Sequence, residues 1–451
     1  MCEICHGKIM DGRDIIKDRK VLCEACDNDA YYRRFKERGK KRRIWRKNGM
    51  NSSIKEKYAT KAEALQILFK KCCPEKQVEM VPLSEAINRV LAKTLESCNT
   101  LPVVRASMMD GIAVSSELFK DSMPDATGWE AGREYSRVDT GDDFDDKYDA
   151  VIAIEKVLID EDDRLQFREE LSVKPGDCVK KSGSTIKKGD YIISAGVPIR
   201  PSDLAALALG GIAKVPVYKK PVVVFIPTGS ELVLAGKTPQ RGENIDSNSM
   251  MAKHMLLEMG AEPVCYPIVK DDPKEIKIAL EKALEQGDIV IMNGGSSKGA
   301  EDFTSKAINK NGAAFLHGVA AGPGRPMSMA VINGKPVINL PGPVAAAYYG
   351  LEWCIRALVN QYLGLPMIKR QRVTAILTED MQCPKFISFL CKVNVQKTAA
   401  GIYTATPIPF KVASIGMCLS TNGQFISEIG EAVYKKGDSI EVELLRGEEF
   451  I

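Results

Sequence analysis

The sequence is poor in residue types on which several common chemistries depend. Only 3 of its 451 residues are histidines, so chemistry that needs several imidazoles is not expected. No run approaches the ~18 consecutive apolar residues that a membrane helix needs, and no basic segment followed by an apolar one opens the chain. We therefore expect neither membrane insertion nor export.

The composition is that of a folded protein with more than one core. Hydrophobic residues make up 45% and charged residues 27%, which argues against a disordered, fibrous or coiled-coil chain. The 451 residues are about three times a typical domain of roughly 150, so we expect two or more domains. The 13 cysteines have no regular spacing overall, which is typical of a protein of the reducing cytoplasm.

Four cysteines near the N-terminus form two Cys-x-x-Cys pairs, Cys2 with Cys5 and Cys23 with Cys26. Two such pairs can present four thiolates tetrahedrally to one Zn²⁺. Four free thiols and a redox pair are the alternatives. Because four cysteine ligands leave no open coordination position, we predict a zinc knuckle at residues 1–30 that is structural and catalyses nothing.

A basic segment follows the cysteines. Residues 33–47 contain ten lysines or arginines and one acid, Glu37. Such a segment can bind nucleic acid by releasing counterions, and Trp45 or Tyr31 could stack on a base. A solvated, charged spacer explains the same pattern, because charge without a recognition fold is weak grounds for nucleic-acid binding. We interpret residues 31–58 as a linker and expect no nucleic-acid partner.

Hydrophobic periodicity divides the rest of an α/β multidomain chain. Apolar residues recur at helical spacing in 60–72, and 84–91 resembles a second helix. Short apolar runs alternate with turns from about 103 to 180 and again after 366, which is typical of β domains. The predicted domains are a helical and linker subdomain (59–99 and 179–199), a small β insertion domain (100–178), an α/β domain (200–366) and a C-terminal, β-barrel-like domain (367–451).

The α/β assignment depends on alternating strand and helix patterns. Apolar runs that predict strands occur at 222–226, 264–268, 289–292 and 337–340, and helical stretches occur at 249–259 and 272–284. This alternation predicts a mostly parallel sheet.

Three glycine-containing turns follow the carboxyl ends of predicted strands. Their residues are Thr228, Gly229 and Ser230; Gly294, Gly295, Ser296, Ser297 and Gly299; and Pro341 and Gly342. Ligands bind open parallel sheets at this edge, where glycines allow backbone N–H groups to approach an anion. A plain tight turn explains one such loop, but three at equivalent strand ends favour a site for a phosphorylated ligand.

Two acids accompany these turns. Asp246 precedes a predicted helix, and Asp302 follows the second glycine turn by three residues. Either acid could simply cap a helix N-terminus. Carboxylates beside a polyphosphate would repel it unless a hard divalent cation neutralised them, so Asp246 and Asp302 are also candidate Mg²⁺ ligands.

The motifs occur in the order and spacing of a known family. They are Val81–Ala86, Ser107–Val114, Asp139–Gly141, Thr228–Leu232, Asp246–Asn248, Gly294–Ser297 and Gly322–Pro326. Over residues 60–451 the chain resembles the molybdopterin molybdotransferase family, which includes bacterial MoeA and the gephyrin E domain. Each motif is short, and their collinearity makes the resemblance specific.

The resemblance implies a cytoplasmic, elongated homodimer whose active site lies at the dimer cleft. With Mg²⁺, it would insert molybdate into adenylylated molybdopterin and release AMP and molybdenum cofactor. Residues 200–366 would bind molybdopterin, and tungstate in place of molybdate stays open. The resemblance implies catalytic roles for Asp246, Asp110, Thr140 and Asp203, with Ser107 and the anion contact Arg325 as weaker matches.

The chain also departs from the family pattern. Ser230 stands where bacterial members usually carry an acid, Gly322 stands where a lysine is common, and the segment 340–343 is a shortened proline loop. Val103-Val104-Arg105 replaces a more polar family pattern. These changes leave open a second hypothesis, a divergent paralogue that binds molybdopterin or its molybdenum form and delivers it to a client enzyme.

The N-terminal cysteines lie outside the core family. Their pattern, with the basic segment that follows, is similar to the zinc knuckle of one component of the formylmethanofuran dehydrogenases. This second resemblance covers only thirty residues and implies no activity, although a zinc module could dock a protein partner. Zinc together with the basic linker also leaves open a third hypothesis, a nucleic-acid-binding regulator that senses molybdopterin.

Overall fold

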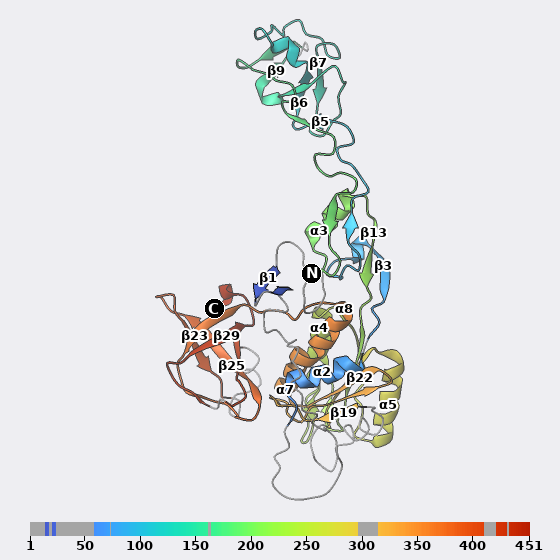
Figure 1. The fold of residues 1–451 in the computed structure, drawn as a ribbon, viewed down its shortest axis with the longest axis vertical. Helices are drawn as coiled ribbons and strands as arrows, with labels where there is room; N and C mark the ends of the chain where they lie inside the picture. The colour runs from blue at the N-terminus through green and yellow to red at the C-terminus, as the bar shows by residue number, and fades with distance from the viewer. Residues whose placement is uncertain are drawn as a thin grey trace, which may run out of the picture. The chain divides into compact units, whose positions relative to one another are not determined.

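The computed structural model describes residues 14–17, 20–23, 58–72, 74–160, 164–295, 314–409, 421–430 and 433–451. The chain divides into two units (Figure 1). The first comprises Met1–Lys76 and Lys220–Ile451, and the second comprises Gln77–Lys219. No helix of the described residues is long and apolar enough to span a membrane.

A six-stranded sheet forms the centre of the first unit. Its strands, in spatial order, are β17 (Glu262–Cys265), β14 (Val222–Pro227), β18 (Ile289–Asn293), β22 (Lys335–Leu340), β21 (Ser328–Ile332) and β19 (Ala314–His317). The first four strands run parallel, as the sequence predicted. Strand β21 runs antiparallel to β22, and the edge strand β19 runs antiparallel to β21, a pattern that was not predicted from the sequence.

Helices cover both sides of this sheet (Figure 1). Helix α5 (Pro273–Gln286) begins at Asp272, whose side chain accepts hydrogen bonds from two backbone N–H groups of the first turn, and Pro273 fits the first helical position. Its buried side chains share one core with alternate residues of β14, β18 and β22. Because neighbouring strand residues point to opposite faces, the other set faces α4 (Asn248–Glu258) and α7 (Val344–Gly350), which contact β14 and β22.

Helix α2 (Lys61–Lys71) packs in this unit. Thr60 and Glu63 form a reciprocal capping box at its start. The helix buries Leu65 and Leu68 and contacts β21. The range predicted as one helical subdomain is therefore divided, because residues 59–76 group with the α/β sheet and residues 77–99 group with the second unit.

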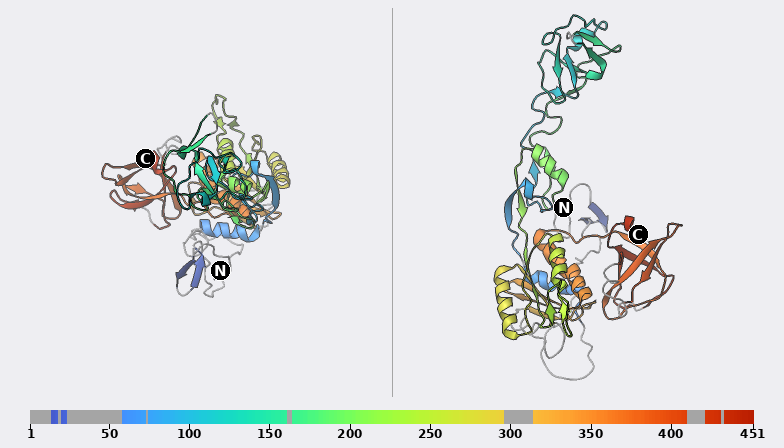
Figure 2. Two further views of the ribbon diagram at one scale, coloured as in Figure 1. Left: turned by 90° about the horizontal axis from the view of Figure 1, so that it is seen from above. Right: turned by 180° about the vertical axis from the view of Figure 1, so that it is seen from behind.

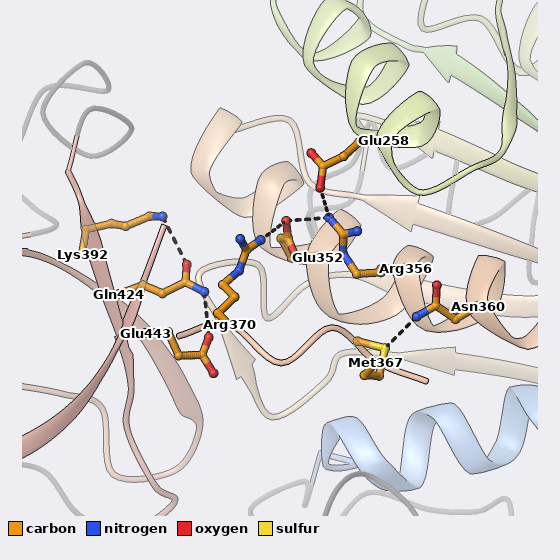
Figure 3. A network of polar contacts seen from close by, with 9 residues as sticks. All are labelled: Glu258, Glu352, Arg356, Asn360, Met367, Arg370, Lys392, Gln424 and Glu443. Atoms are coloured by element: carbon orange, nitrogen blue, oxygen red, sulfur yellow. Dashed lines mark hydrogen bonds and ion pairs between the residues drawn. The ribbon is translucent and has the colours of Figure 1, made fainter. Parts of the chain in front are cut away.

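An ion-pair network around the buried Arg356 reaches the C-terminal end of helix α4 (Figure 3). After α7, a π-helical turn (Leu351–Ile355) leads into α8 (Arg356–Leu363). The Arg356 side chain is only 2% exposed and lies 3.1 Å from Glu352 and 3.2 Å from Glu258, the last residue of α4. Arg370 also contacts Glu352, at 2.9 Å. A buried arginine needs such partners, because removing one would leave an uncompensated charge.

The C-terminal region of the first unit, predicted from the sequence as a β-barrel-like domain, is a closed five-stranded barrel (Figure 2). Its strands are β25 (Ser388–Lys397), β26 (Tyr403–Pro407), β23 (Arg372–Leu377), β29 (Ser439–Leu444) and β27 (Gly423–Ile426). Pairing of β25 with both β26 and β27 closes the barrel. Burial alternates along β23 and β29, so every second side chain enters the core.

The second unit contains separate cores. In residues 100–178, the antiparallel sheet β7 (Tyr135–Val138), β6 (Gly111–Val114) and β8 (Ala150–Ala153) and the hairpin of β9 (Val157–Ile159) and β10 (Leu165–Phe167) share one apolar cluster. Another cluster joins β3 (Val78–Pro82), β13 (Lys214–Tyr218) and helix α3 (Pro201–Leu209). Short pairs complete the unit: β4 (Leu95–Glu96) with β12 (Tyr191–Ile193), and β5 (Ala106–Ser107) with β11 (Val179–Lys180).

The second helix expected at 84–91 is wrong. Only a short 3₁₀ turn forms, at Leu83–Glu85. Asn88 then adopts a left-handed backbone conformation with a φ of 60°, which no α-helix accommodates. Val90 and Leu91 form bridges to Pro198 and Val217 instead.

At the N-terminus, the described residues form a hairpin of β1 (Asp14–Lys17) and β2 (Lys20–Cys23). Cys23 therefore ends a strand. Cys2, Cys5, Cys26 and the linker up to residue 57 lie outside the described residues, so the zinc knuckle stays a prediction.

Candidate functional site

The carboxyl ends of three parallel strands meet at one edge of the α/β sheet. Just after β14, the backbone N–H of Thr228 donates to the carbonyl of Asn293 at 2.8 Å. Just after β18, the N–H of Gly294 donates to the carbonyl of Leu340 at 3.0 Å. Two of the predicted turns therefore continue the ladder of the sheet, and the third begins where β22 ends.

Two buried asparagines hold the turns together. The side-chain amide of Asn248, at the start of α4, donates to the side-chain oxygen of Asn293 at 2.8 Å and to the carbonyl of Gly342 at 2.7 Å. Asn293 in turn donates to the carbonyl of Pro341 at 2.9 Å. Both asparagines are less than 10% exposed. Through these hydrogen bonds, this Asn248–Asn293 pair ties the start of α4 to the ends of β18 and β22.

Neither asparagine was among the site residues predicted from the sequence. A signal was present, because Asn293 directly ends a four-residue apolar run and Asn248 opens the helix that follows Asp246. A polar amide at the end of a buried strand needs a partner, which would have pointed to a helix start nearby.

Gly294 is required by the approach of two backbones. Its φ is 123°, a conformation that L residues rarely adopt. A Cβ at this position would overlap the carbonyl oxygen and hydroxyl of Thr228. A close backbone approach was predicted at this glycine and is present, but the group that approaches is Thr228 at the end of β14, not a ligand.

Several backbone amides expected to bind an anion are engaged within the protein. Beyond the ladder contacts of Thr228 and Gly294, the N–H of Gly229 donates to the carbonyl of Val269 at 3.0 Å. The hydroxyl of Thr228 is buried and lies 3.2 Å from the carbonyl of Asn293, to which it donates. These groups build the edge and are not available to a ligand in this structure.

The donors expected farther along the turns are described only in part. Gly295 adopts a φ of 53° and leads toward Ser296, Ser297, Gly299 and Asp302. Those four residues lie outside the described ones. Apart from Gly342 and its two chain neighbours, no atom of the described residues lies within 4 Å of where a Cβ of Gly342 would be.

Asp246 sits at the start of α4, beside the Asn248–Asn293 pair. One carboxylate oxygen accepts from the backbone N–H of Ser249 at 3.0 Å, and the other accepts from the Ser249 hydroxyl at 2.5 Å. Asp246 therefore caps the helix, as one of the two sequence interpretations held. Each carboxylate oxygen has a second acceptor position, so capping does not prevent metal binding.

Ser230 forms a reciprocal pair with Asp271, an acid that was not predicted from the sequence. Its backbone N–H donates to the carboxylate of Asp271 at 3.0 Å, and its hydroxyl accepts from the N–H of Asp271 at 3.1 Å. An acid in place of Ser230 would set two carboxylates against each other.

Arg325 lies beside two aromatic rings. Its guanidinium carbon is 5.4 Å from the ring centre of Tyr58 and 5.6 Å from that of Phe386. A guanidinium beside aromatic rings at these distances is attracted to them by cation–π interactions. Arg325 is exposed, so it can meet an anion.

In the second unit, the structure brings Asp110 and Thr140 together. One oxygen of Asp110 accepts from the backbone N–H of Thr140 at 2.7 Å and from its hydroxyl at 2.9 Å. These two hydrogen bonds, the backbone one first, lower the pKa of Asp110 below its ordinary value of 3.8. The result is an exposed, firmly ionised carboxylate.

The other predicted residues of this unit have structural partners. Asp203 accepts from the backbone N–H and side chain of Arg200 at the start of α3, and the Arg200 side chain is the main cause of its lowered pKa. Ser107 is fully buried and donates to the carbonyl of Met109 at 2.5 Å.

No group of three or more histidine, cysteine or acidic side chains that could hold a metal occurs within the described part of the chain. Of the two predicted Mg²⁺ ligands, Asp246 is described and Asp302 lies outside the described residues. A Mg²⁺ ion often uses only one or two protein carboxylates beside substrate phosphates and water, and Asp246 fits that pattern.

Comparisons with known proteins agree with this architecture. The family model described as "MoeA N-terminal region (domain I and II)" matches residues 59–211, and the one described as "Probable molybdopterin binding domain" matches residues 224–361. The molybdopterin molybdenumtransferase of Haemophilus influenzae is 30% identical over 318 residues, covering 68% of this chain and 78% of that protein. The chain belongs to the molybdopterin molybdenumtransferase family.

Further relatives of this family span more of the chain. The molybdopterin molybdenumtransferase of Bacillus subtilis is 28% identical over 394 residues, covering 82% of this chain and 91% of that protein. A crystal structure of the molybdopterin biosynthesis MoeA protein from Pyrococcus horikoshii has a TM-score of 0.69 at 25% identity. It covers 87% of this chain and all of that one. The family resemblance inferred from the sequence motifs is confirmed.

Proposed function

We propose that this protein is a molybdopterin molybdenumtransferase, which inserts molybdate into adenylylated molybdopterin and releases AMP. The observation that carries the proposal is the hydrogen-bonded edge of the α/β sheet, where Asn248 and Asn293 tie the strand ends to the helix that follows Asp246, in a domain that matches the molybdopterin-binding family model. Relatives named as molybdenumtransferases match most of the chain, and this match does not favour the non-catalytic delivery hypothesis.

Electrostatics is the main demand of the reaction. Molybdate, a phosphoanhydride and a dithiolene bring several negative charges together, so catalysis depends on positioning and charge stabilisation. Asp246, held by Ser249, would bind Mg²⁺, which when present neutralises phosphate charge. The exposed guanidinium of Arg325 would attract an anion. The nucleophile and the leaving group belong to the substrates.

The remaining predicted residues complete the proposal. Gly295 and Gly342 would offer backbone N–H groups to the phosphate, and Ser296, Ser297, Gly299 and Asp302, which lie outside the described residues, stay proposed ligand contacts. Asp110, kept ionised by Thr140, would serve the same reaction, and Asp203 would keep Arg200 in place. The loss of an acid at Ser230 is offset by the neighbouring carboxylate of Asp271.

Assembly and zinc binding belong to the proposal as well. The proposed enzyme is a cytoplasmic homodimer, with a structural Zn²⁺ held by Cys2, Cys5, Cys23 and Cys26. The spacing of the two Cys-x-x-Cys pairs supports the zinc knuckle, which would dock a protein partner.

The test is release of AMP by the purified full chain. Adenylylated molybdopterin, molybdate and Mg²⁺ are mixed with the protein, and AMP is measured by chromatography. We expect AMP to form only when all three are present, and a parallel reaction with tungstate defines the oxyanion preference. Absence of AMP from a protein with an intact circular dichroism spectrum would contradict the proposal.

A further inference from the structure

Two cysteine thiols lie against each other in the C-terminal barrel, far along the chain from the predicted zinc ligands. Cys383 follows the short strand β24 (Met381–Gln382), and Cys391 belongs to β25. Their Sγ atoms are 3.4 Å apart. The two residues are 7% and 8% exposed, so both thiols lie just under the surface.

The distance between the thiols suits a disulfide. A disulfide bond is ~2.0 Å long, so the Sγ atoms, now 3.4 Å apart, need to approach by about 1.4 Å. Side-chain rotation can supply much of such a movement. Within the described residues, no third histidine, cysteine or acid joins the pair into a metal-binding group, so metal binding has less support.

The two thiols are chemically different. A hydrogen bond from Cys391, and to a smaller extent one from Ser427, lowers the pKa of Cys383. The same interaction, together with burial, raises the pKa of Cys391. Because the thiolate is the attacking species in thiol–disulfide exchange, Cys383 is the more reactive of the two.

We propose that Cys383 and Cys391 form a redox-active dithiol that low-molecular-weight disulfides, such as glutathione disulfide, oxidise to an intramolecular disulfide. The Cys383 thiolate attacks one sulfur of the oxidant, forming a mixed disulfide and releasing one thiolate. Cys391 then loses its proton and attacks the Cys383 sulfur, and the second thiolate leaves. Two electrons pass to the oxidant, which is reduced to two thiols.

The segment between the two cysteines gives the disulfide a structural consequence. Phe386 in this segment contacts Arg325, with 5.6 Å between the ring centre and the guanidinium carbon. The backbone N–H of Ser388 donates to the carbonyl of Ala320 at 3.0 Å. Oxidation would therefore cross-link the segment that holds Arg325 on one side. The dithiol itself is independent of the proposed transferase activity.

Tryptic mapping tests this proposal on the full chain. The reduced protein is incubated with glutathione disulfide at neutral pH, remaining thiols are alkylated, and the protein is digested without reduction. Trypsin cleaves after Lys385, so Cys383 and Cys391 fall on separate peptides, 373–385 and 386–392. We expect these peptides to appear as one linked species, lighter than their sum by two hydrogen atoms, which dithiothreitol separates again.

The exposed thiols of Cys98 and Cys265 serve as internal controls, and we expect glutathione adducts there. In the variant Cys391→Ser, Cys383 should end as a glutathione adduct, because no second thiol can displace it. A Cys265→Ser variant should form the linked peptide like the parent. Recovery of both barrel peptides unlinked from the oxidised parent, whether alkylated or carrying glutathione, would overturn the proposal.

Discussion

Two aspartates that we propose to act in the same reaction are held in different ways. Asp246 accepts from the backbone N–H of Ser249 with one carboxylate oxygen and from the Ser249 hydroxyl with the other, and α4 is tied at its start by the Asn248–Asn293 pair and contacts Arg356 at its end. Asp110 uses one oxygen, and its described partner is Thr140, thirty residues away. The position of Asp246 therefore depends on a framework that includes the buried Asn248–Asn293 pair and Gly294, whereas the position of Asp110 depends on its contact with one exposed residue, Thr140.

The largest effect should come from the framework itself. Gly294→Ala places an alanine at a φ of 123°, where L residues are strained, and its Cβ would overlap Thr228. We expect the free energy of unfolding to fall by about 3–5 kcal/mol and AMP release to be lost. Urea denaturation and the AMP assay measure the two effects.

Gly334→Ala is the matched control for that variant. Gly334 also has a positive φ, 77°, but nothing lies within 4 Å of the added Cβ. Its cost should be only about 1 kcal/mol, with AMP release retained. Equal effects of the two substitutions would show that the contact with Thr228 is unimportant.

A smaller effect on stability but a clear effect on activity should follow from Asp246→Asn. The amide keeps one acceptor for Ser249 and removes the charge. AMP release should fall by about 100-fold, with the free energy of unfolding changed by no more than about 1 kcal/mol. The Mg²⁺ concentration needed for half-maximal activity should rise.

Asp272→Asn provides the comparison for Asp246. Asp272 caps α5 with two backbone contacts and lies outside the proposed site residues. AMP release should stay within about twofold of the parent, since asparagine caps helices about as well as aspartate. If both variants lose activity alike, Asp246 acts only as a helix cap.

The smallest effect should come from Thr140→Val, which removes the hydroxyl bond to Asp110 and keeps the backbone one. The pKa of Asp110, now lowered, should rise toward 3.8, and AMP release should fall by less than about tenfold. The pKa of Asp110 is lower in the folded protein than in the unfolded chain, so its hydrogen bonds to Thr140 stabilise the fold. This contribution to the free energy of unfolding is complete above the ordinary pKa of 3.8 and is lost as the pH falls through the pKa of the folded state. Carboxyl NMR measures this pKa.

Thr127→Val is the control for this variant. Thr127 gives Asp125 the same two hydrogen bonds, and the pKa of Asp125 is lowered for the same reason. That pair is local, however, and belongs to no predicted site. The pKa of Asp125 should rise without a change in AMP release. If AMP release falls in this variant as well, the loss of activity in Thr140→Val is not specific to the contact with Asp110.

The sequence was sufficient where local pattern decides structure. The parallel strands β14, β18 and β22 are confirmed because continuous apolar runs are typical of buried parallel strands. The resemblance to the family was carried by collinear motifs and is confirmed as well.

Side-chain roles at the edge of the sheet could not be read from the sequence. Whether the N–H groups of Thr228 and Gly229 face a ligand depends on partners such as Asn293 and Val269, which lie 65 and 40 residues away along the chain. Asp271 was missed for the same reason, because only the fold brings it to Ser230.

The most direct test is a crystal structure of the full chain with adenylylated molybdopterin bound. We expect a phosphoryl group of the ligand at the carboxyl edge of the α/β sheet, within hydrogen-bonding distance of the backbone N–H of Gly295 or Gly342 and close to Asp246. A ligand bound elsewhere, with this edge empty, would contradict it.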